Sequence, residues 1–189
     1  MSWYQPHLCQ SLELIRHSLI GQSAAVIDIG GGTSTLVDDL LDDGVQDLTI
    51  LDISAAALQI VRDRLGPRAS SVKWLEADIL EVKLPPDYFD VWHDRAVFHF
   101  LTMEQDQRHY VDCAKSAIKL GGNLVVATFA MDGPQQCSNL TTARYSPDLL
   151  QAAFSDGFEL VESASEIHET PWHGEQSFVY CRFRRTGSA

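Results

Sequence analysis

The chain has 189 residues, of which 45% are hydrophobic and 21% are charged, a composition that favours a single globular domain over residues 1–189. Lysine and arginine total 14 against 26 aspartate and glutamate residues, and the formal net charge of −12 argues against a nucleic-acid partner. The longest apolar runs fall far short of the roughly 20 residues that cross a bilayer, so we expect no membrane span.

The N-terminal residues and the cysteines bear on the cellular compartment. Residues 1–10 contain no basic segment followed by a long apolar run, which predicts a cytoplasmic protein without a secretory signal. The four cysteines are widely spaced and form neither a C-x-x-C pair nor a zinc-binding pattern with histidine. We therefore expect reduced thiols and no metal site. A monomer and a homodimer both remain open.

Apolar periodicity divides the first two thirds of the chain into alternating helices and strands. Helices are predicted where apolar residues recur every three to four positions, and strands where short apolar runs end at glycine or polar residues. Ser54 is expected to begin one helix and Gly66-Pro67 to end it. In chain order the predicted elements are a helix over 8–20, a strand over 24–29, a helix over 35–43, a strand over 47–52, a helix over 54–65, strands over 72–76 and 89–92, a helix over 104–119 that stops at Gly121-Gly122, and a strand over 123–129.

The last third of the chain follows a different order. It reads as a polar loop over 131–144, a helix over 146–154 and strands over 158–163 and 176–183. Because no helical segment separates the last two strands, we expect them to form an antiparallel pair at the sheet edge. The earlier strands alternate with helices, which predicts parallel βαβ units. The sequence therefore predicts a Rossmann-like α/β fold, in which a seven-stranded, mostly parallel sheet has helices on both faces and an antiparallel strand at one edge.

A glycine-rich segment, Gly30-Gly31-Gly32, follows the first predicted strand. Glycine lets the backbone turn sharply and approach a ligand closely, which is typical of a nucleotide-binding loop. A dinucleotide fingerprint would need glycine at position 35, where this chain has Thr35, and would gain nothing from Asp28 beside a pyrophosphate. The segment therefore predicts a ligand that carries an ammonium and a sulfonium group.

These residues resemble the first motif of the class I S-adenosylmethionine-dependent methyltransferases. Asp28, Gly30 and Gly32 match that motif, while Ser34 replaces its usual final glycine. Two further acidic residues at strand ends match the family: Asp52, which is expected to accept hydrogen bonds from the ribose, and Asp78, which is expected near the adenine. The resemblance covers residues 24–129 and implies S-adenosyl-L-methionine as cofactor, with S-adenosyl-L-homocysteine as product. The cofactor-binding residues that it implies are Asp28, Gly30, Gly31, Gly32, Asp52, Ile53, Asp78, Ile79, His93 and Asp94.

The segment after the fourth core strand is expected to face the methyl acceptor. His93 and His99 are candidate proton acceptors because an unperturbed imidazole titrates near neutral pH. Arg95 is the third catalytic candidate, and with Asp94 it is expected to orient ligands in the pocket. The alternatives are packing roles for the two histidines and a surface ion pair between Asp94 and Arg95.

Further substrate-binding candidates lie outside the core. Trp3 and Tyr4 belong to an N-terminal segment, 1–21, that is expected to close over the cofactor. Arg144 and Tyr145 follow the long polar loop in the region 130–189, which we expect to bind the substrate together with Arg95. An arginine there is suited to a carboxylate on the acceptor. His168, Trp172 and His173 are predicted in a turn that closes the same pocket.

Two acceptor classes follow from the resemblance. The first is a small molecule methylated on nitrogen, oxygen or sulfur, since the chain has no obvious substrate-recognition insertion. The second is a lysine in a basic protein segment, since Asp94-Arg95-Ala96 resembles an Asp-Lys-Gly triplet of compact lysine methyltransferases, with Arg95 and Ala96 as departures. A non-enzymatic role as a cofactor sensor is a third reading. The motif of nucleic-acid amino-methyltransferases is absent after the fourth strand, which argues against that substrate.

Overall fold

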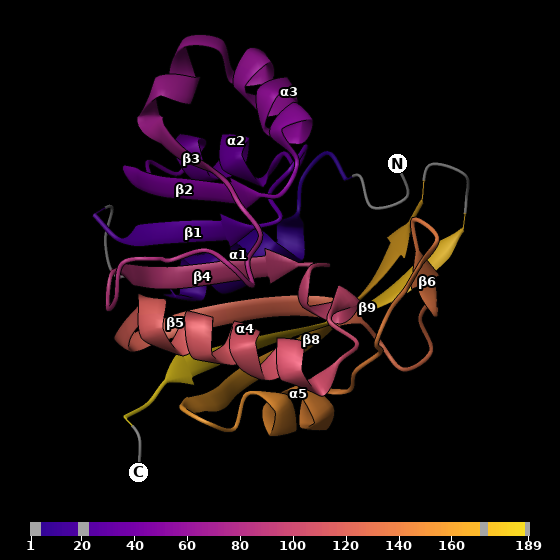
Figure 1. Cartoon of the computed structure of the whole chain (residues 1–189). Coiled ribbons are helices and arrows are strands. Elements are labelled where there is room, and N and C mark those ends of the chain that lie inside the picture. The colour runs from indigo at the N-terminus through magenta and orange to yellow at the C-terminus, as the bar shows by residue number, and fades with distance from the viewer. Residues whose placement is uncertain (1–4, 19–22, 171–173, 188–189) are drawn as a thin grey trace.

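The computed structural model describes residues 5–18, 23–170 and 174–187 and contains a seven-stranded sheet with the strand order β3-β2-β1-β4-β5-β9-β8 (Figure 1). The strands of this sheet are β1 (Ala25–Ile29), β2 (Asp47–Asp52), β3 (Val72–Glu76), β4 (Phe89–Arg95), β5 (Ile118–Phe129), β8 (Phe158–Glu169) and β9 (Glu175–Arg185). The α-helices are α1 (Cys9–Ser18), α2 (Leu36–Asp42), α3 (Ala55–Leu65), α4 (Glu104–Ala117) and α5 (Pro147–Ala153), and two 3₁₀ helices are η1 (Gly66–Ser71) and η2 (Phe98–Phe100).

The first five strands of the sheet are parallel, and β9 is antiparallel to both of its neighbours, β5 and the edge strand β8. This arrangement confirms the predicted fold class, including the antiparallel pair at one edge. The final two strands are longer than predicted, so His168 lies within β8 and not in a turn. Trp172 and His173 lie outside the described residues.

Helices cover both faces of the sheet and create two apolar layers (Figure 1). One layer joins α1, α2 and α3 to residues such as Val26, Leu48 and Val91. The other joins α4 and α5 to Ile27 and Trp92. Neighbouring residues of a strand point to opposite faces, so the almost continuous apolar runs of β1 and β4 are explained by burial on both sides.

Two helix starts agree with the sequence. The hydroxyl of Ser54 accepts a hydrogen bond from the backbone N–H of Ala57 at 3.2 Å, and that of Ser146 accepts from Leu149 at the same distance. Such N-caps stabilise a helix by about 1 kcal/mol each. Ser54 also ends the loop that follows β2, so its cap helps to fix the backbone beside the predicted ribose-binding residue Asp52.

The predicted break at Gly121-Gly122 has a different function. The helix α4 ends at Ala117, and β5 begins directly at Ile118, which pairs with Phe89. The strand pairing between β4 and β5 is then irregular, and Gly121 has φ +80°. The two glycines therefore permit an irregularity inside a strand, and the predicted helix end at Gly121-Gly122 is wrong.

The segment predicted as a polar loop contains a small hairpin, formed by β6 (Gln136–Cys137) and β7 (Leu140–Thr141). Ser138 and Asn139 connect the two strands with φ values of +52° and +65°. Positive φ at both central residues is the geometry of a two-residue hairpin turn that matches strand twist. This hairpin lies beyond the carboxyl ends of β1 and β4 (Figure 1).

Within the described residues, every helix is too short or too polar to cross a membrane.

Candidate functional site

A cavity of about 580 Å³ lies at the carboxyl ends of β1, β2, β3 and β4. The glycine segment and the residues after β2 and β3 line one end, while the end of β4, residues Gln5 and Leu8, and the β6–β7 hairpin line the other. Ligands of open parallel sheets bind at this edge, where neighbouring connections run in opposite directions. The volume falls within the range of about 300 to 1,000 Å³ that is usual for small-molecule sites.

The glycine segment has no room for side chains. A Cβ added to Gly30, whose φ is +67°, would lie 2.2 Å from Cγ2 of Val97. At Gly31 it would lie 2.6 Å from Cγ2 of Ile50, and at Gly32 it would lie 2.7 Å from Oδ2 of Asp52. The backbone of this segment can therefore approach a ligand closely, and the carboxylate of Asp52 lies directly against the backbone of Gly32.

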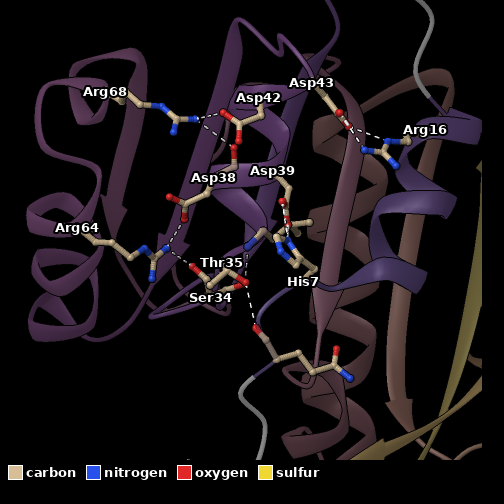
Figure 2. A network of polar contacts seen from close by, with 12 residues as sticks. His7, Arg16, Ser34, Thr35, Asp38, Asp39, Asp42, Asp43, Arg64 and Arg68 are labelled. Carbon is tan, nitrogen blue, oxygen red and sulfur yellow. Dashed lines mark hydrogen bonds and ion pairs between the residues drawn. The ribbon is translucent and has the colours of Figure 1, made fainter.

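Arg64 of α3 holds the residues that follow the glycines (Figure 2). Its guanidinium donates to the carbonyl oxygens of Thr33 at 3.2 Å and Ser34 at 2.6 Å, and to Oδ2 of Asp38 at 2.6 Å. Arg68 makes a similar pair with Asp42 on the same acidic helix, α2, but donates no hydrogen bond to the loop in the described contacts. The loop conformation is thus fixed from outside the cavity.

Two predicted cofactor carboxylates lie in the cavity wall. Oδ1 of Asp52 accepts from the backbone N–H of Ser54 at 2.8 Å, and burial raises the pKa of Asp52 while hydrogen bonds from Ser54 and Gly32 oppose that rise. Oδ1 of Asp78 accepts from the N–H of Leu80 at 2.9 Å.

Ile53 and Ile79 border the same end of the cavity. The side chain of Ile53 is exposed, with 71% of its surface accessible, while Ile79 is buried. An exposed branched apolar residue next to a cavity is well placed to cover a flat aromatic ligand.

The third carboxylate, Asp28, forms a buried chain with His93 and Ser11. Oδ1 of Asp28 lies 2.7 Å from Nδ1 of His93, and Nε2 of His93 lies 2.9 Å from Oγ of Ser11. All three residues are buried. Asp28 and His93 line the cavity, but both ring nitrogens of His93 already have partners. This geometry disagrees with the prediction of His93 as a proton acceptor, since a base needs a nitrogen that reaches the acceptor.

Asp94 is oriented away from the cavity. Its carboxylate accepts from the N–H groups of Val97 at 2.9 Å and Phe98 at 3.0 Å, and from the hydroxyl of Tyr110 at 2.5 Å. Complete burial raises the pKa of Asp94 to about 6, against the effect of these donors. The side chain of Asp94 is therefore absent from the cavity wall, because alternation along β4 places Asp94 on the face opposite His93, and its role toward the cofactor stays a prediction.

His99 is buried in η2 behind the cavity wall. Its ring lies against Phe129, with 4.6 Å between ring centroids, and its Nδ1 accepts from the N–H of Phe129 at 3.4 Å. Burial and the nearby charge of Arg95 lower the pKa of His99 to about 3. A group with this pKa is a weak proton acceptor at neutral pH, which disagrees with the catalytic role predicted for His99.

Arg95 lines the part of the cavity at the end of β4, where its charge acts on Cys137 of the hairpin. Its Nε donates to the hydroxyl of Tyr180 at 3.0 Å, and its guanidinium lies 4.4 Å from the ring centroid of Phe178. The Tyr180 hydroxyl donates in turn to Oε2 of Glu166 at 2.6 Å, and Nε2 of Gln5 donates to the other oxygen of Glu166 at 3.3 Å. Tyr180, Glu166 and Gln5 were not predicted, because no local motif marks them: Gln5 lies before α1, Glu166 lies in the largely polar strand β8, and Tyr180 lies in β9.

Other predicted substrate residues lie away from the cavity wall. Arg144 donates to the backbone carbonyls of Met131 at 2.8 Å and Gly133 at 3.4 Å, so it holds the loop that carries the hairpin. Tyr145 is buried against Phe98, and burial raises its pKa to about 12. Trp3 and Tyr4 lie outside the described residues. The hairpin contributes Cys137, Ser138 and Leu140 to the wall in their place.

The site offers no described metal-binding group. Within residues 5–18, 23–170 and 174–187, no cluster of three histidine, cysteine, aspartate or glutamate side chains can hold a metal ion. The four cysteines are free thiols. What the cavity does present is a bare backbone loop and three carboxylates, a set that suits a cationic, nucleoside-like ligand.

Comparisons with known proteins agree with this geometry. Residues 26–122, just over half of the chain, match a family model described as "Methyltransferase domain". The "EEF1A lysine methyltransferase 2" of Danio rerio is 25% identical over 148 residues, which are 75% of this chain and 58% of that protein. The "eEF1A lysine and N-terminal methyltransferase" of Mus musculus is 28% identical over 107 residues, which are 56% of this chain and 15% of that protein. The chain thus spans between about a seventh and three fifths of these relatives.

A solved structure with a similar fold is the 1,6-didemethyltoxoflavin-N1-methyltransferase of Burkholderia thailandensis with bound 1,6-didemethyltoxoflavin and S-adenosylhomocysteine. Its TM-score is 0.72 with 20% sequence identity, and the match covers 95% of this chain and 78% of that chain. At this identity, the similarity shows a shared fold.

Proposed function

Because the chain belongs to the family of class I S-adenosylmethionine-dependent methyltransferases, we propose that it transfers a methyl group from S-adenosyl-L-methionine to nitrogen, oxygen or sulfur of a small molecule. The observation that carries this proposal is the shared cavity. One space of about 580 Å³ reaches from the glycine segment to the hairpin, so that a cofactor and a small acceptor have places in the same enclosure.

The residues at the glycine end fit the cofactor. The Gly30–Gly32 backbone would lie against the amino-acid part, and Asp52 would accept hydrogen bonds from the ribose hydroxyls. Asp78 and Ile79 would contact the adenine, with Ile53 covering it. The buried Asp28–His93 pair adds a carboxylate below the loop, where it favours positive charge. Asp94 supports this wall indirectly, through the backbone of Val97 and Phe98.

When bound, S-adenosyl-L-methionine would supply an electrophilic methyl carbon: the lone pair of the acceptor atom would form the new bond to it, and the electron pair of the broken carbon–sulfur bond would stay on sulfur. The chain's own contribution is alignment and exclusion of water. Alignment alone lowers a barrier by as much as about 7 to 11 kcal/mol in favourable cases. Since His93 and His99 are engaged or buried, we assign them to positioning, and an acceptor proton leaves to solvent.

The experiment that tests cofactor binding compares Asp52→Ala with Asp112→Ala. We expect Asp52→Ala to weaken the binding of S-adenosyl-L-homocysteine by about 1 to 3 kcal/mol, because hydrogen bonds to a charged group are lost. Asp112 is exposed on α4, so its variant should bind as the unmodified protein does. Isothermal titration calorimetry measures both. Unchanged affinity in Asp52→Ala would remove this residue from the site.

Protein lysine methylation is the second candidate, and the sequence similarity to two lysine methyltransferases favours it. To distinguish the two acceptor classes, the enzyme and labelled S-adenosyl-L-methionine are added to a cell extract that has been divided into a small-metabolite fraction and a protein fraction, and the label in each fraction is measured. Our proposal predicts label in the metabolite fraction. Label confined to a protein band would support the lysine reading.

A further inference from the structure

We propose that the methyl acceptor is a small carboxylate with an apolar body, and that Arg95 binds its negative group with Tyr180 and Glu166 as positioning residues. This inference rests on the proposed small-molecule methyltransferase function and names its substrate class.

Charge is divided along the cavity. Asp28, Asp52 and Asp78 come from β1 and from the ends of β2 and β3, at the glycine end of the wall. Among the wall residues in the described part of the chain, Arg95 is the only arginine or lysine, and it comes from β4, toward the hairpin. If the cationic cofactor occupies the glycine end, beside the three aspartates, then the acceptor lies beside the positive charge of Arg95.

The guanidinium of Arg95 is held in place. Tyr180 accepts from its Nε at 3.0 Å, and the ring of Phe178 lies under it at 4.4 Å. Tyr180 stays protonated, since burial raises its pKa, and its hydroxyl donates to Glu166 at 2.6 Å. A planar guanidinium that is fixed before binding loses less conformational entropy when it pairs with a carboxylate.

Glu166 is itself fixed from two sides, by Tyr180 and by Gln5. Nε2 of Gln5 also lies 2.8 Å from Nδ1 of His168, and the backbone carbonyl of Gln5 accepts a hydrogen bond from the hydroxyl of Thr35 at 3.1 Å. The network therefore connects β8 and β9 to Thr35, the residue directly before α2, around the guanidinium of Arg95. Glu166 is absent from the cavity wall and is linked to Arg95 through the hydroxyl of Tyr180.

The rest of this end is apolar. Leu8, Phe100, Leu101 and Leu140 line it together with the thiol of Cys137. Burial raises the pKa of Cys137, which favours the neutral thiol. An acceptor that combines an apolar body with one carboxylate matches these surfaces. The ammonium of a lysine would instead meet the positive charge of Arg95 in a partly desolvated space.

The test uses matched pairs that exchange a carboxylate for an ammonium: benzoate against benzylamine, hexanoate against hexylamine, and indole-3-acetate against tryptamine. Calorimetry is carried out on the whole protein saturated with S-adenosyl-L-homocysteine. We expect the carboxylates to bind about tenfold more tightly than their amine partners, because a charge-assisted bidentate pair forms only with the anion. Tighter binding of the amines, or no binding of either series at millimolar concentration, overturns the proposal.

Variants locate the effect at Arg95. In Arg95→Gln the preference for carboxylates should disappear while the affinity for S-adenosyl-L-homocysteine stays within about twofold, and in Tyr180→Phe the preference should fall by a smaller factor. Arg108→Gln, an exposed change on α4, is the control and should bind as the unmodified protein does. A preference that survives in Arg95→Gln overturns the assignment to this residue.

The cofactor measurement separates two kinds of failure. Bound S-adenosyl-L-homocysteine without carboxylate preference overturns the acceptor class alone. Absence of cofactor binding overturns the proposed function as well. Because the preference is first measured in the unmodified protein, a variant that fails to fold does not remove the test.

Discussion

Ala96 is a non-glycine residue in the left-handed region, with φ +71°. It follows Arg95 in the wall of the cavity, and its N–H donates to the carbonyl of Ala127 at 2.9 Å. The left-handed conformation costs an L-residue roughly 1 to 2 kcal/mol. The turn from β4 into η2 therefore stores backbone strain in the cavity wall, where Asp94 and the β5 carbonyl hold it.

We expect Ala96→Gly to raise the free energy of unfolding by about 0.5 to 1 kcal/mol, because relief of the strain exceeds the greater chain entropy of glycine. Chemical denaturation measures the change. Ala56→Gly, on the exposed side of α3, should lower the free energy of unfolding by about 0.5 to 1 kcal/mol. Equal destabilisation in both variants would contradict the assignment of strain to Ala96.

Asp94 gives a pH-dependent contribution to stability. Its pKa is raised to about 6 from 3.8, so the folded state holds the proton more tightly than the unfolded chain. The stability due to this group is fully present below the unfolded pKa and is lost as pH rises through the folded pKa. The loss between pH 4 and 7 is about 2 kcal/mol.

The measurement compares the unmodified protein with Asp94→Asn by denaturation across this pH range. We expect the stability advantage of the unmodified protein to shrink as pH rises from 4 to 7, because asparagine does not titrate. Asp112→Asn, at an exposed position, serves as the control and should leave the pH profile unchanged. A constant difference between the unmodified protein and Asp94→Asn would contradict the prediction.

At the scale of elements, the three aspartates of α2 and the aspartate that follows it form ion pairs with neighbouring segments (Figure 2). The pairs are Asp38 with Arg64 of α3, Asp39 with His7, Asp42 with Arg68 of η1, and Asp43 with Arg16 of α1. Most of these pairs are substantially exposed, and isolated exposed ion pairs contribute little to stability. Arg64 differs because it also binds two carbonyls of the glycine loop. Its role is therefore to fix the loop conformation, with little effect on the stability of the whole fold.

We expect Arg64→Met to weaken the binding of S-adenosyl-L-homocysteine about 3- to 10-fold, since the loop must then be ordered by the ligand. Arg68→Met removes a comparable pair with α2 without touching the loop, so its affinity should stay within about twofold. Calorimetry on both variants measures the difference. Equal losses would place the effect in α2 as a whole and not in the loop.

At the scale of the whole molecule, the formal net charge of −12 sets the long-range field. A carboxylate acceptor approaches against this field and is attracted by Arg95 only at short range. A lysine-rich protein would be attracted from a distance. The sign of the salt dependence therefore separates the two acceptor classes without knowledge of the acceptor atom.

We expect kcat/KM for the best-binding carboxylate to rise about threefold between low and physiological ionic strength, because salt screens the long-range repulsion. Initial rates of label transfer at increasing potassium chloride measure it. S-adenosyl-L-homocysteine affinity, measured over the same range, corrects for effects on the cofactor. A rate that falls as salt rises would favour a cationic protein substrate.

The order of helices and strands was predictable because it depends on local periodicity. The bounds of β2 and β3 agree with the prediction to the residue, and Ser54 caps its helix as expected. The placement of the glycine segment and the strand-end aspartates at one sheet edge was also predictable, since parallel strands bring their carboxyl ends to the same edge. The placement of Asp94 on the sheet face opposite His93 could also have been predicted, because neighbouring residues of a strand point to opposite faces.

The sequence alone therefore determined the layered fold and the glycine end of the cavity, both of which follow from patterns of a few neighbouring residues. Only the tertiary structure decided the part of the cavity around Arg95. The contacts of Arg95 with Tyr180 and of Tyr180 with Glu166 depend on the register of β5, β9 and β8, and Gln5 reaches them from the start of the chain. Such contacts join residues far apart in the sequence, so no local period records them.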